Sequence, residues 1–190
     1  MQTLAVSLKK RLGRFASDED GNIAIEATII MPIMFWAYLT MFSIFDAYRQ
    51  YTESQKAAYT ISDLISRQTT PLDDAFIDST RELFDTMTRT IDRPSVRVTI
   101  VKYDEETDDY TVEWSKSRGS FLNLDDAAIA DWDSKLPVMP DEENVIIFET
   151  QSTYDPPFNL ALETRTINNF VFTRPRYAPQ VCWLTCDDVT

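Results

Sequence analysis

Histidine is absent from this sequence of 190 residues. Its absence excludes a Ser–His–Asp triad, a histidine general base and a histidine-ligated zinc site. Catalysis by carboxylates or by cysteine stays open, but no pair of carboxylates stands out. We therefore name no catalytic residue and expect no cofactor. An envelope enzyme that works through carboxylates is the least favoured of the functions considered below.

Basic residues are scarce as well. Lysine and arginine number 18 against 31 Asp and Glu, which gives a formal net charge of −13 and a sequence pI of about 4.3. Residues 1–21 carry a net charge of +1, so the rest of the chain sums to −14; the basic residues of this leader are Lys9, Lys10, Arg11 and Arg14. Nucleic-acid binding needs clustered Lys and Arg, and no cluster follows the leader. The composition argues against a nucleic-acid partner.

The sequence holds one long hydrophobic run, from Ile23 to Phe45. At the helical rise it spans about 34 Å, enough to cross the hydrocarbon core of a bilayer. Glu26 is its single ionisable residue. Pro32 should weaken or kink the helix, because proline lacks a backbone N–H. We predict a transmembrane helix over residues 22–45, with the amino terminus in the cytoplasm because the basic leader precedes it.

A glycine stands two positions before the start of this run. Ordinary secretory signals are cut after their apolar region, next to small residues, and no Ala-x-Ala pattern follows Phe45. Gly21 instead precedes the run, and Glu26 stands five residues beyond it in the segment DGNIAIEATIIMP. A basic leader, this glycine and this glutamate resemble type IV pilins and pseudopilins. The resemblance implies that prepilin peptidase cuts between Gly21 and Asn22 and leaves the helix as an anchor.

Two details of this processing site stay open. Gly21 has no side chain, so an extended backbone could enter a protease cleft closely; the alternative is a simple loop glycine. Asn22 occupies a position where many pilins carry Phe, which leaves N-methylation of the new amino terminus undecided.

Glu26 is expected to take part in assembly. A carboxylate in the membrane costs about 2.5–3.5 kcal/mol at the centre and less near the interface, so it needs a partner. After cleavage the ammonium group of Asn22 supplies one, either within the chain, one helical turn away, or between neighbouring subunits. The second arrangement would set the axial register of a filament. The alternative is that Glu26 only reaches towards the lipid headgroups.

Helical periodicity continues after Phe45. A narrow stripe recurs at spacings of four and three residues, formed by Ala47, Tyr51, Ser54, Ala58, Ile61 and Ile65. It predicts that residues 46–70 extend the same helix to about 40 residues, ending at Gln68–Pro71. We expect the stripe to pack against the domain; a coiled-coil seam is the alternative. A second amphipathic helix is predicted over Asp73–Ile91.

The remaining sequence reads mainly as strands. Val96, Val98 and Ile100 alternate with polar residues, as do Tyr110, Val112 and Trp114, which predicts a hairpin. The acidic DEETDD between them is expected to be a solvated loop, because it lacks the ligand pattern and turn glycine of an EF-hand calcium site. Further elements are predicted as a short helix over Asp125–Leu136 and strands over Val145–Tyr154 and Thr166–Thr173. The fold class is α+β: residues 71–190 form a roughly four-stranded, mainly antiparallel sheet domain carried by the long helix.

Two segments near the carboxyl end extend the resemblance. TYDPPF at 153–158 and FVFTRPRY at 170–177 resemble the pattern of the TadE-like branch of pilin-related proteins, in which a strand with Tyr and Pro is followed by a terminal strand ending in Arg-Pro-Arg. The matching residues are Tyr154, Pro156, Pro157, Phe158, Arg174, Pro175 and Arg176. Arg174 and Arg176 are expected to form intramolecular salt bridges.

The two cysteines, Cys182 and Cys186, stand close together near the carboxyl end. In an oxidising compartment they would form a disulfide, which requires a turn, since this spacing in a regular helix separates the Cβ atoms too far. Two cysteines without histidine make a metal site improbable, and none is expected.

The resemblance implies a structural or assembly component of a tight-adherence (Tad/Flp) pilus, a TadE-like minor pilin or pseudopilin. Its partners would be prepilin peptidase, other pilins or pseudopilins and the assembly-platform proteins of that system. Such a protein crosses the bacterial inner membrane once, with its domain in the periplasm, and could enter a surface pilus; no adhesion target is indicated. The alternative is a membrane-anchored extracytoplasmic binding module that never joins a filament.

Overall fold

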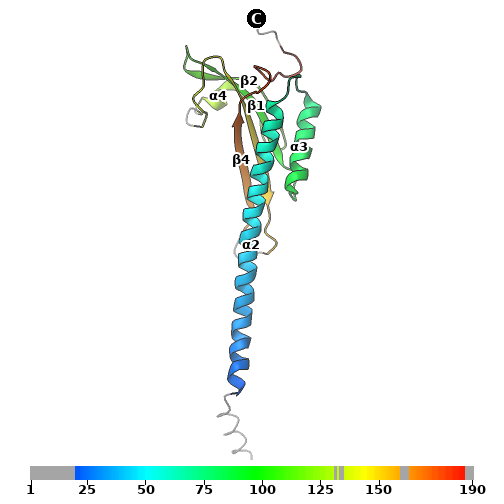
Figure 1. Cartoon of the computed structure of the whole chain (residues 1–190), viewed down its shortest axis with the longest axis vertical. Helices are drawn as coiled ribbons and strands as arrows, with labels where there is room; N and C mark the ends of the chain where they lie inside the picture. Colours follow the sequence, from blue (N-terminus) through cyan, green and yellow to red (C-terminus); the bar gives the residue numbers. More distant parts are fainter. Residues whose placement is uncertain (1–19, 131, 133–134, 159–162, 187–190) are drawn as a thin grey trace, which may run out of the picture.

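The computed structural model describes residues 20–130, 132, 135–158 and 163–186, with side chains from residue 24 onward. One helix dominates it: α2, Asp20–Ser66, runs for 47 residues and extends far beyond the rest of the domain (Figure 1). The helix continues through Pro32 without interruption, so the expected weakening there does not break it. Its length agrees with the prediction of a membrane helix extended into the domain.

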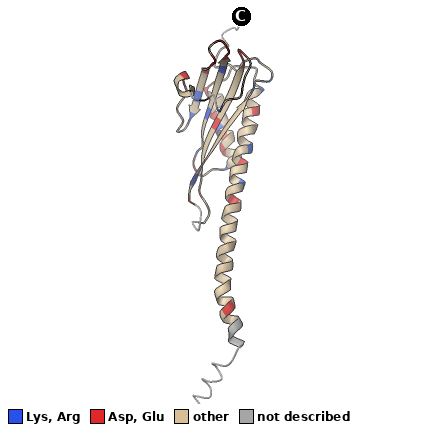
Figure 2. Cartoon of the chain, turned by 90° about the vertical axis from the view of Figure 1, so that its left-hand side faces the viewer, with Lys and Arg blue, Asp and Glu red and all other residues tan. Residues whose placement is uncertain are grey.

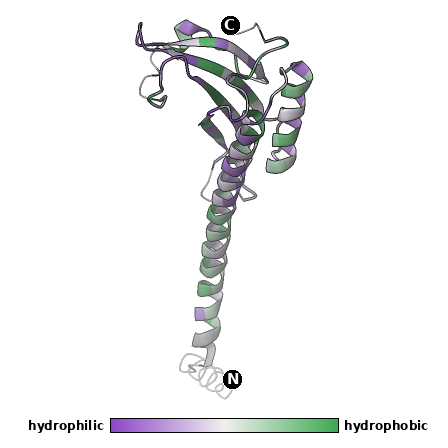
Figure 3. Ribbon diagram, turned by 45° about the horizontal axis from the view of Figure 1, so that its top comes forward, coloured by the Kyte–Doolittle hydropathy of each residue, from purple (hydrophilic) through white to green (hydrophobic). Residues whose placement is uncertain are grey.

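The apolar part of α2 is exposed along its length. The helix is long and apolar enough to span a membrane, and only 6% of its most apolar stretch is buried against the rest of the chain. A core helix of a soluble protein would be mostly buried. Figure 3 shows that hydrophobic residues predominate along this projecting half, and Figure 2 shows how few charged residues it carries.

A second helix, α3 (Asp74–Thr88), packs beside the upper half of α2 (Figure 1). Asp73 caps its start, since the Asp73 carboxylate accepts a hydrogen bond from the Phe76 amide at 2.8 Å. The helix ends at Arg89 in a left-handed conformation, before the predicted end at Ile91, which is exposed. The buried apolar side of α3 is formed by Ile77 and Phe84.

Four strands form one antiparallel sheet: β1 (Ser95–Asp104), β2 (Asp109–Arg118), β3 (Asn144–Tyr154) and β4 (Arg165–Thr173). Their order is β2-β1-β3-β4, and a bulge shifts the β1–β2 register between Ile100 and Val101. The acidic segment is the turn of the β1–β2 hairpin. The predicted α+β fold, with a long helix carrying a four-stranded antiparallel sheet, is confirmed.

Both faces of the sheet are covered. On one face α2 lies over β3 and β4 while α3 lies over β1 and β2, and the core between them includes Ile61, Phe84, Val98 and Phe148. On the other face the segment between β2 and β3 covers Val101 and Ile147. This segment contains α4 (Asp126–Ile129), which is one short turn instead of the predicted helix over Asp125–Leu136.

Because the ring of Phe148 is buried, we predict that its removal lowers the stability of the domain. Phe148→Ala removes a fully buried side chain from the centre of β3 and should lower the free energy of unfolding by about 3–5 kcal/mol. The measurement is urea unfolding of the full chain in detergent micelles, followed by tryptophan fluorescence. Leu122→Ala, at a position 81% exposed, is the control and should change stability by less than about 0.5 kcal/mol. Equal effects of the two substitutions would contradict this description of the core.

Candidate assembly helix and its junction with the domain

Gly21 and Asn22 lie in the first turn of α2, whereas the basic leader lies outside the described residues. The backbone at the expected processing site is therefore helical rather than extended. The first four N–H groups of a helix lack intrahelical acceptors, so a first turn is the part of a helix that unwinds most readily. A peptidase that needs an extended substrate would have to open only this end.

Glu26 is exposed on the projecting helix, one turn beyond Asn22. It borders a shallow apolar groove of about 350 Å³ with Ala27, Ile30, Met31 and Met34. The next basic residue along the helix is Arg49, which the helical rise places about 35 Å away. A cation for Glu26 must therefore come from the amino-terminal end of its own helix or from another molecule.

The helix joins the domain through three groups of contacts, of which the lowest surrounds Tyr154. The Tyr154 hydroxyl donates to the Ser43 carbonyl (3.4 Å) and to the Asp46 carboxylate (3.1 Å). Burial, together with the hydrogen bond to Asp46, raises the pKa of Tyr154 to about 12. Just beyond it, the ring of Phe158 packs edge-on against Phe42, with centroids 6.1 Å apart. We call these contacts the lower clasp.

The middle of the junction is a seam of small residues. Ser54, Ala57 and Ala58 of α2 are almost fully buried, so the helix backbone approaches the sheet closely. The Asn169 amide donates to Ser54 Oγ at 2.7 Å and to Thr150 Oγ1 at 2.9 Å, which pairs these polar groups inside the interface. The predicted stripe faces the domain as expected, except at Tyr51, which is 46% exposed. The coiled-coil alternative does not describe this seam within the chain.

The upper clasp holds the end of α2. Arg176 pairs with Asp63 at 3.0 Å, and the Arg176 amide donates to the Ser66 carbonyl at 2.8 Å. Arg174 pairs with Glu143 at 3.1 Å. Both arginines thus make the expected intramolecular ion pairs. The C-terminal motif is nevertheless divided: Tyr154 belongs to the lower clasp and Arg176 to the upper one, about 30 Å apart along the helix.

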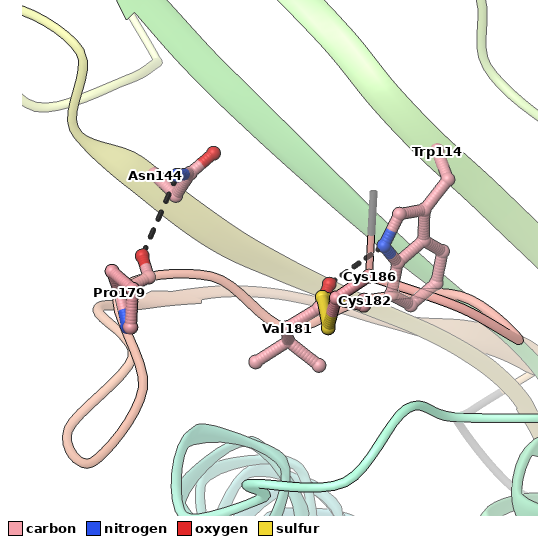
Figure 4. The surroundings of a disulfide bond; sticks show 6 residues. All are labelled: Trp114, Asn144, Pro179, Val181, Cys182 and Cys186. Carbon is pink, nitrogen blue, oxygen red and sulfur yellow. Dashed lines mark hydrogen bonds between the residues drawn. A yellow bond between two sulfur atoms is a disulfide. The ribbon is translucent and has the colours of Figure 1, made fainter. Parts of the chain in front are cut away.

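A disulfide joins Cys182 and Cys186, whose Cα atoms lie 5.1 Å apart (Figure 4). The segment around it is fixed on both sides. The Trp114 indole N–H donates to the Val181 carbonyl at 2.8 Å, and the Leu72 amide donates to the Cys182 carbonyl at 2.9 Å. The disulfide therefore locks a turn that connects the sheet to the loop between α2 and α3.

Beside the disulfide lies a cavity of about 760 Å³ that the sequence did not indicate. Trp114, Trp183 and Arg174 contribute to its walls. Two buried oxygens on its lining residues, Glu143 Oε2 and Asn144 Oδ1, have no hydrogen-bond partner within the described part of the chain. Buried acceptors without donors are unfavourable, so these atoms favour a donor from water or from a ligand. The sequence signal that could have indicated this cavity is the pair of polar residues Glu143 and Asn144 at the start of β3.

Among residues 20–130, 132, 135–158 and 163–186 no group of three or more Cys, Asp or Glu is placed to hold a metal ion. Comparisons of the chain with protein-family models, with curated proteins and with solved structures find no match.

From the lower clasp we predict that the contribution of Tyr154 to the free energy of unfolding depends on pH. Tyr154→Phe should cost about 1 kcal/mol near neutral pH, because Asp46 loses its donor. The pKa of Tyr154 is raised from 10.0 to about 12, so its contribution is complete below pH 10 and is lost as the pH rises from 10 to about 12. The stability difference between wild type and Tyr154→Phe, measured by urea unfolding, should be constant up to pH 10 and narrow above it.

Tyr103 provides the control for this measurement. A hydrogen bond to Asp108 raises its pKa to about 12 as well, but it lies at the hairpin far from α2. Introducing Tyr154→Phe into a Tyr103→Phe background should leave the Tyr154-dependent difference unchanged. A difference that persists undiminished to pH 12 would show that the Tyr154 hydroxyl does not act as described.

Proposed function

We propose that this protein is a minor pilin or pseudopilin of a tight-adherence type of pilus, processed by prepilin peptidase after Gly21. The observation that carries the proposal is the exposed apolar half of α2, in which Glu26 is the only ionisable group and stands five residues after Gly21. A helix of this kind is suited to lateral packing with other helices. No catalysis by this chain is involved; it acts as a peptidase substrate and an assembly component.

The proposal sets the order of events. The chain inserts in the inner membrane with its leader in the cytoplasm and its domain in the periplasm, where Cys182 and Cys186 can be oxidised. Cleavage then creates an ammonium group at Asn22, one turn from Glu26. The lower and upper clasps bind the domain to the helix, so axial placement of the helix among its neighbours also places the domain. Initiation, capping or adhesion would suit a domain of this size.

Cleavage is the first test. Co-expression with a prepilin peptidase should yield a mature chain that begins at Asn22, as determined by intact-mass measurement and N-terminal sequencing. Gly21→Ala should abolish or strongly reduce cleavage, because the added methyl group obstructs close approach of the backbone to the protease. Gly13→Ala, in the leader, is the matched control and should be cleaved normally. A mature chain that still starts at Met1 would remove the pilin proposal.

Assembly through Glu26 is a separate prediction. Glu26→Ala should leave cleavage intact but reduce incorporation into pili, because the ammonium group of Asn22 loses its counter-charge in an apolar environment. The measurement is the amount of the chain in sheared pilus fractions relative to membranes. Glu53→Ala, a carboxylate on the same helix outside the apolar half, is the control. Normal incorporation of Glu26→Ala would exclude Glu26 from the assembly mechanism.

The cavity beside the disulfide favours a second candidate, a membrane-anchored binding module that does not join a filament. Its two unpartnered acceptors, Glu143 Oε2 and Asn144 Oδ1, suit a ligand that donates hydrogen bonds. The cleavage experiment separates the candidates, since a binding module needs no processing at Gly21.

A further inference from the structure

We propose that Pro157 and Phe158, which follow β3, insert in the same bilayer surface that α2 crosses, so that the domain contacts the membrane at a second point. The partner is the phospholipid bilayer itself. The inference rests on the proposed membrane-spanning role of α2 and goes beyond it, because these two residues lie more than a hundred positions further along the chain. The contact residues are Pro157 and Phe158, which we call the insertion tip.

The depth of the tip follows from its contact with α2. The Phe158 ring lies 6.1 Å from that of Phe42. Phe42 precedes the end of the apolar run at Phe45 by three residues, so the helical rise places it about 5 Å inside that end. Phe158, which is 39% exposed, therefore lies at the level where acyl chains meet headgroups. An exposed aromatic ring at this level is stabilised by lipid rather than by water.

The insertion tip is held at this level. The Tyr154 hydroxyl contacts Ser43 and Asp46 on the turn of α2 above Phe42. Pro156 is buried, and two consecutive prolines restrict the backbone before Phe158. On the return side, the Thr164 hydroxyl donates to Asp155 at 2.8 Å. The tip cannot leave the bilayer surface without breaking contacts that join the domain to the helix.

A groove between α2 and β4 lies at the height expected for the lipid headgroups and has residues that suit them. It has a volume of about 570 Å³ and is lined by Tyr48 and Tyr51 of the helix and by Arg165 and Ile167 of β4. Tyr48 is 71% exposed and follows Phe45 by three residues, about 5 Å above the apolar run, where headgroups extend for about 5–7 Å. Tyrosine favours this layer, and an arginine there can bind lipid phosphate. The domain thus presents apolar groups at acyl depth and polar aromatic groups directly above them.

A second copy of the chain could cover the same surface in a filament. The bilayer is favoured because the tip is coplanar with the end of the apolar run, and lipid surrounds that level before any neighbour arrives. The test therefore uses the chain at a low protein-to-lipid ratio and repeats the measurement at a high one.

The experiment measures the depth of single fluorescent labels in the full chain reconstituted in liposomes. Cysteines are introduced by Phe158→Cys and, to retain the ring contact with Phe42, by Pro157→Cys. Met31→Cys reports on the span, and Val138→Cys, at a position 95% exposed, reports on bulk solvent. Without reductant the native cysteines stay paired, so an environment-sensitive dye reacts only with the new thiol. Lipids that carry a quencher at shallow or deep acyl positions then report depth.

We expect the shallow quencher to remove most of the emission from labels at positions 157 and 158. The label at position 31 should be quenched most by the deep quencher, and the label at position 138 should not be quenched. Quenching at 31 while both loop positions behave like 138 would overturn the insertion and leave the membrane span intact. Absence of quenching at 31 as well would overturn both. Loop positions that behave like 138 at the low protein-to-lipid ratio, and whose dye reports an apolar environment without lipid quenching only at the high ratio, would assign the surface to a second copy and overturn the bilayer contact.

Discussion

Between Ser43 and Ser66 a single helix satisfies two requirements: it continues the rod that begins in the apolar segment, and it supplies one wall of the core. Small residues make this possible, since Ser54, Ala57 and Ala58 bring the helix backbone close to β3 and β4. Larger side chains at these positions would push the sheet away and open a cavity under Phe148. The attachment of the sheet to the helix depends on this contact.

The domain is attached to the helix at several levels rather than by a hinge. The lower clasp at Tyr154, the Asn169 pair in the seam and the upper clasp at Arg176 are distributed over about 30 Å of helix. A displacement or rotation of α2 must therefore carry the sheet with it. For an assembly component this matters, because the position of the helix among its neighbours determines where the distal end of the domain lies.

The two ends of the molecule have different chemistry. The projecting end is apolar from Ile23 to Phe45, where Glu26 is the single charged side chain, and Phe158 packs on Phe42 near the upper limit of this segment. The distal end holds the disulfide, two paired tryptophans and a polar cavity. Under the proposed function, the helix between the two ends would keep the assembly segment apart from the distal surface.

Local patterns in the sequence were sufficient to predict most of the helices and strands. The apolar run, the alternation in β1 and β2 and the acidic turn are properties of neighbouring residues, so the long helix and the hairpin could be predicted without the structure. The predicted helix over Asp125–Leu136 was too long. The composition of this segment is typical of a helix, but its apolar residues pack on the sheet and α4 covers only Asp126–Ile129. The consecutive apolar residues Val145–Phe148 indicated in retrospect that the sheet is buried on both faces.

For the candidate site too, some features followed from the sequence and others only from the tertiary structure. The sequence alone determined three things that depend on distance along the chain: the spacing of Gly21 and Glu26, the length of the apolar run, and the closeness of Cys182 and Cys186, which are each other's only possible disulfide partner within the chain. Only the tertiary structure decided that Tyr154 and Arg176, which belong to one sequence motif, fasten opposite ends of the helical seam. It also placed Phe158 beside Phe42, since contacts between residues far apart in sequence follow from how the sheet lies on the helix and leave no local pattern.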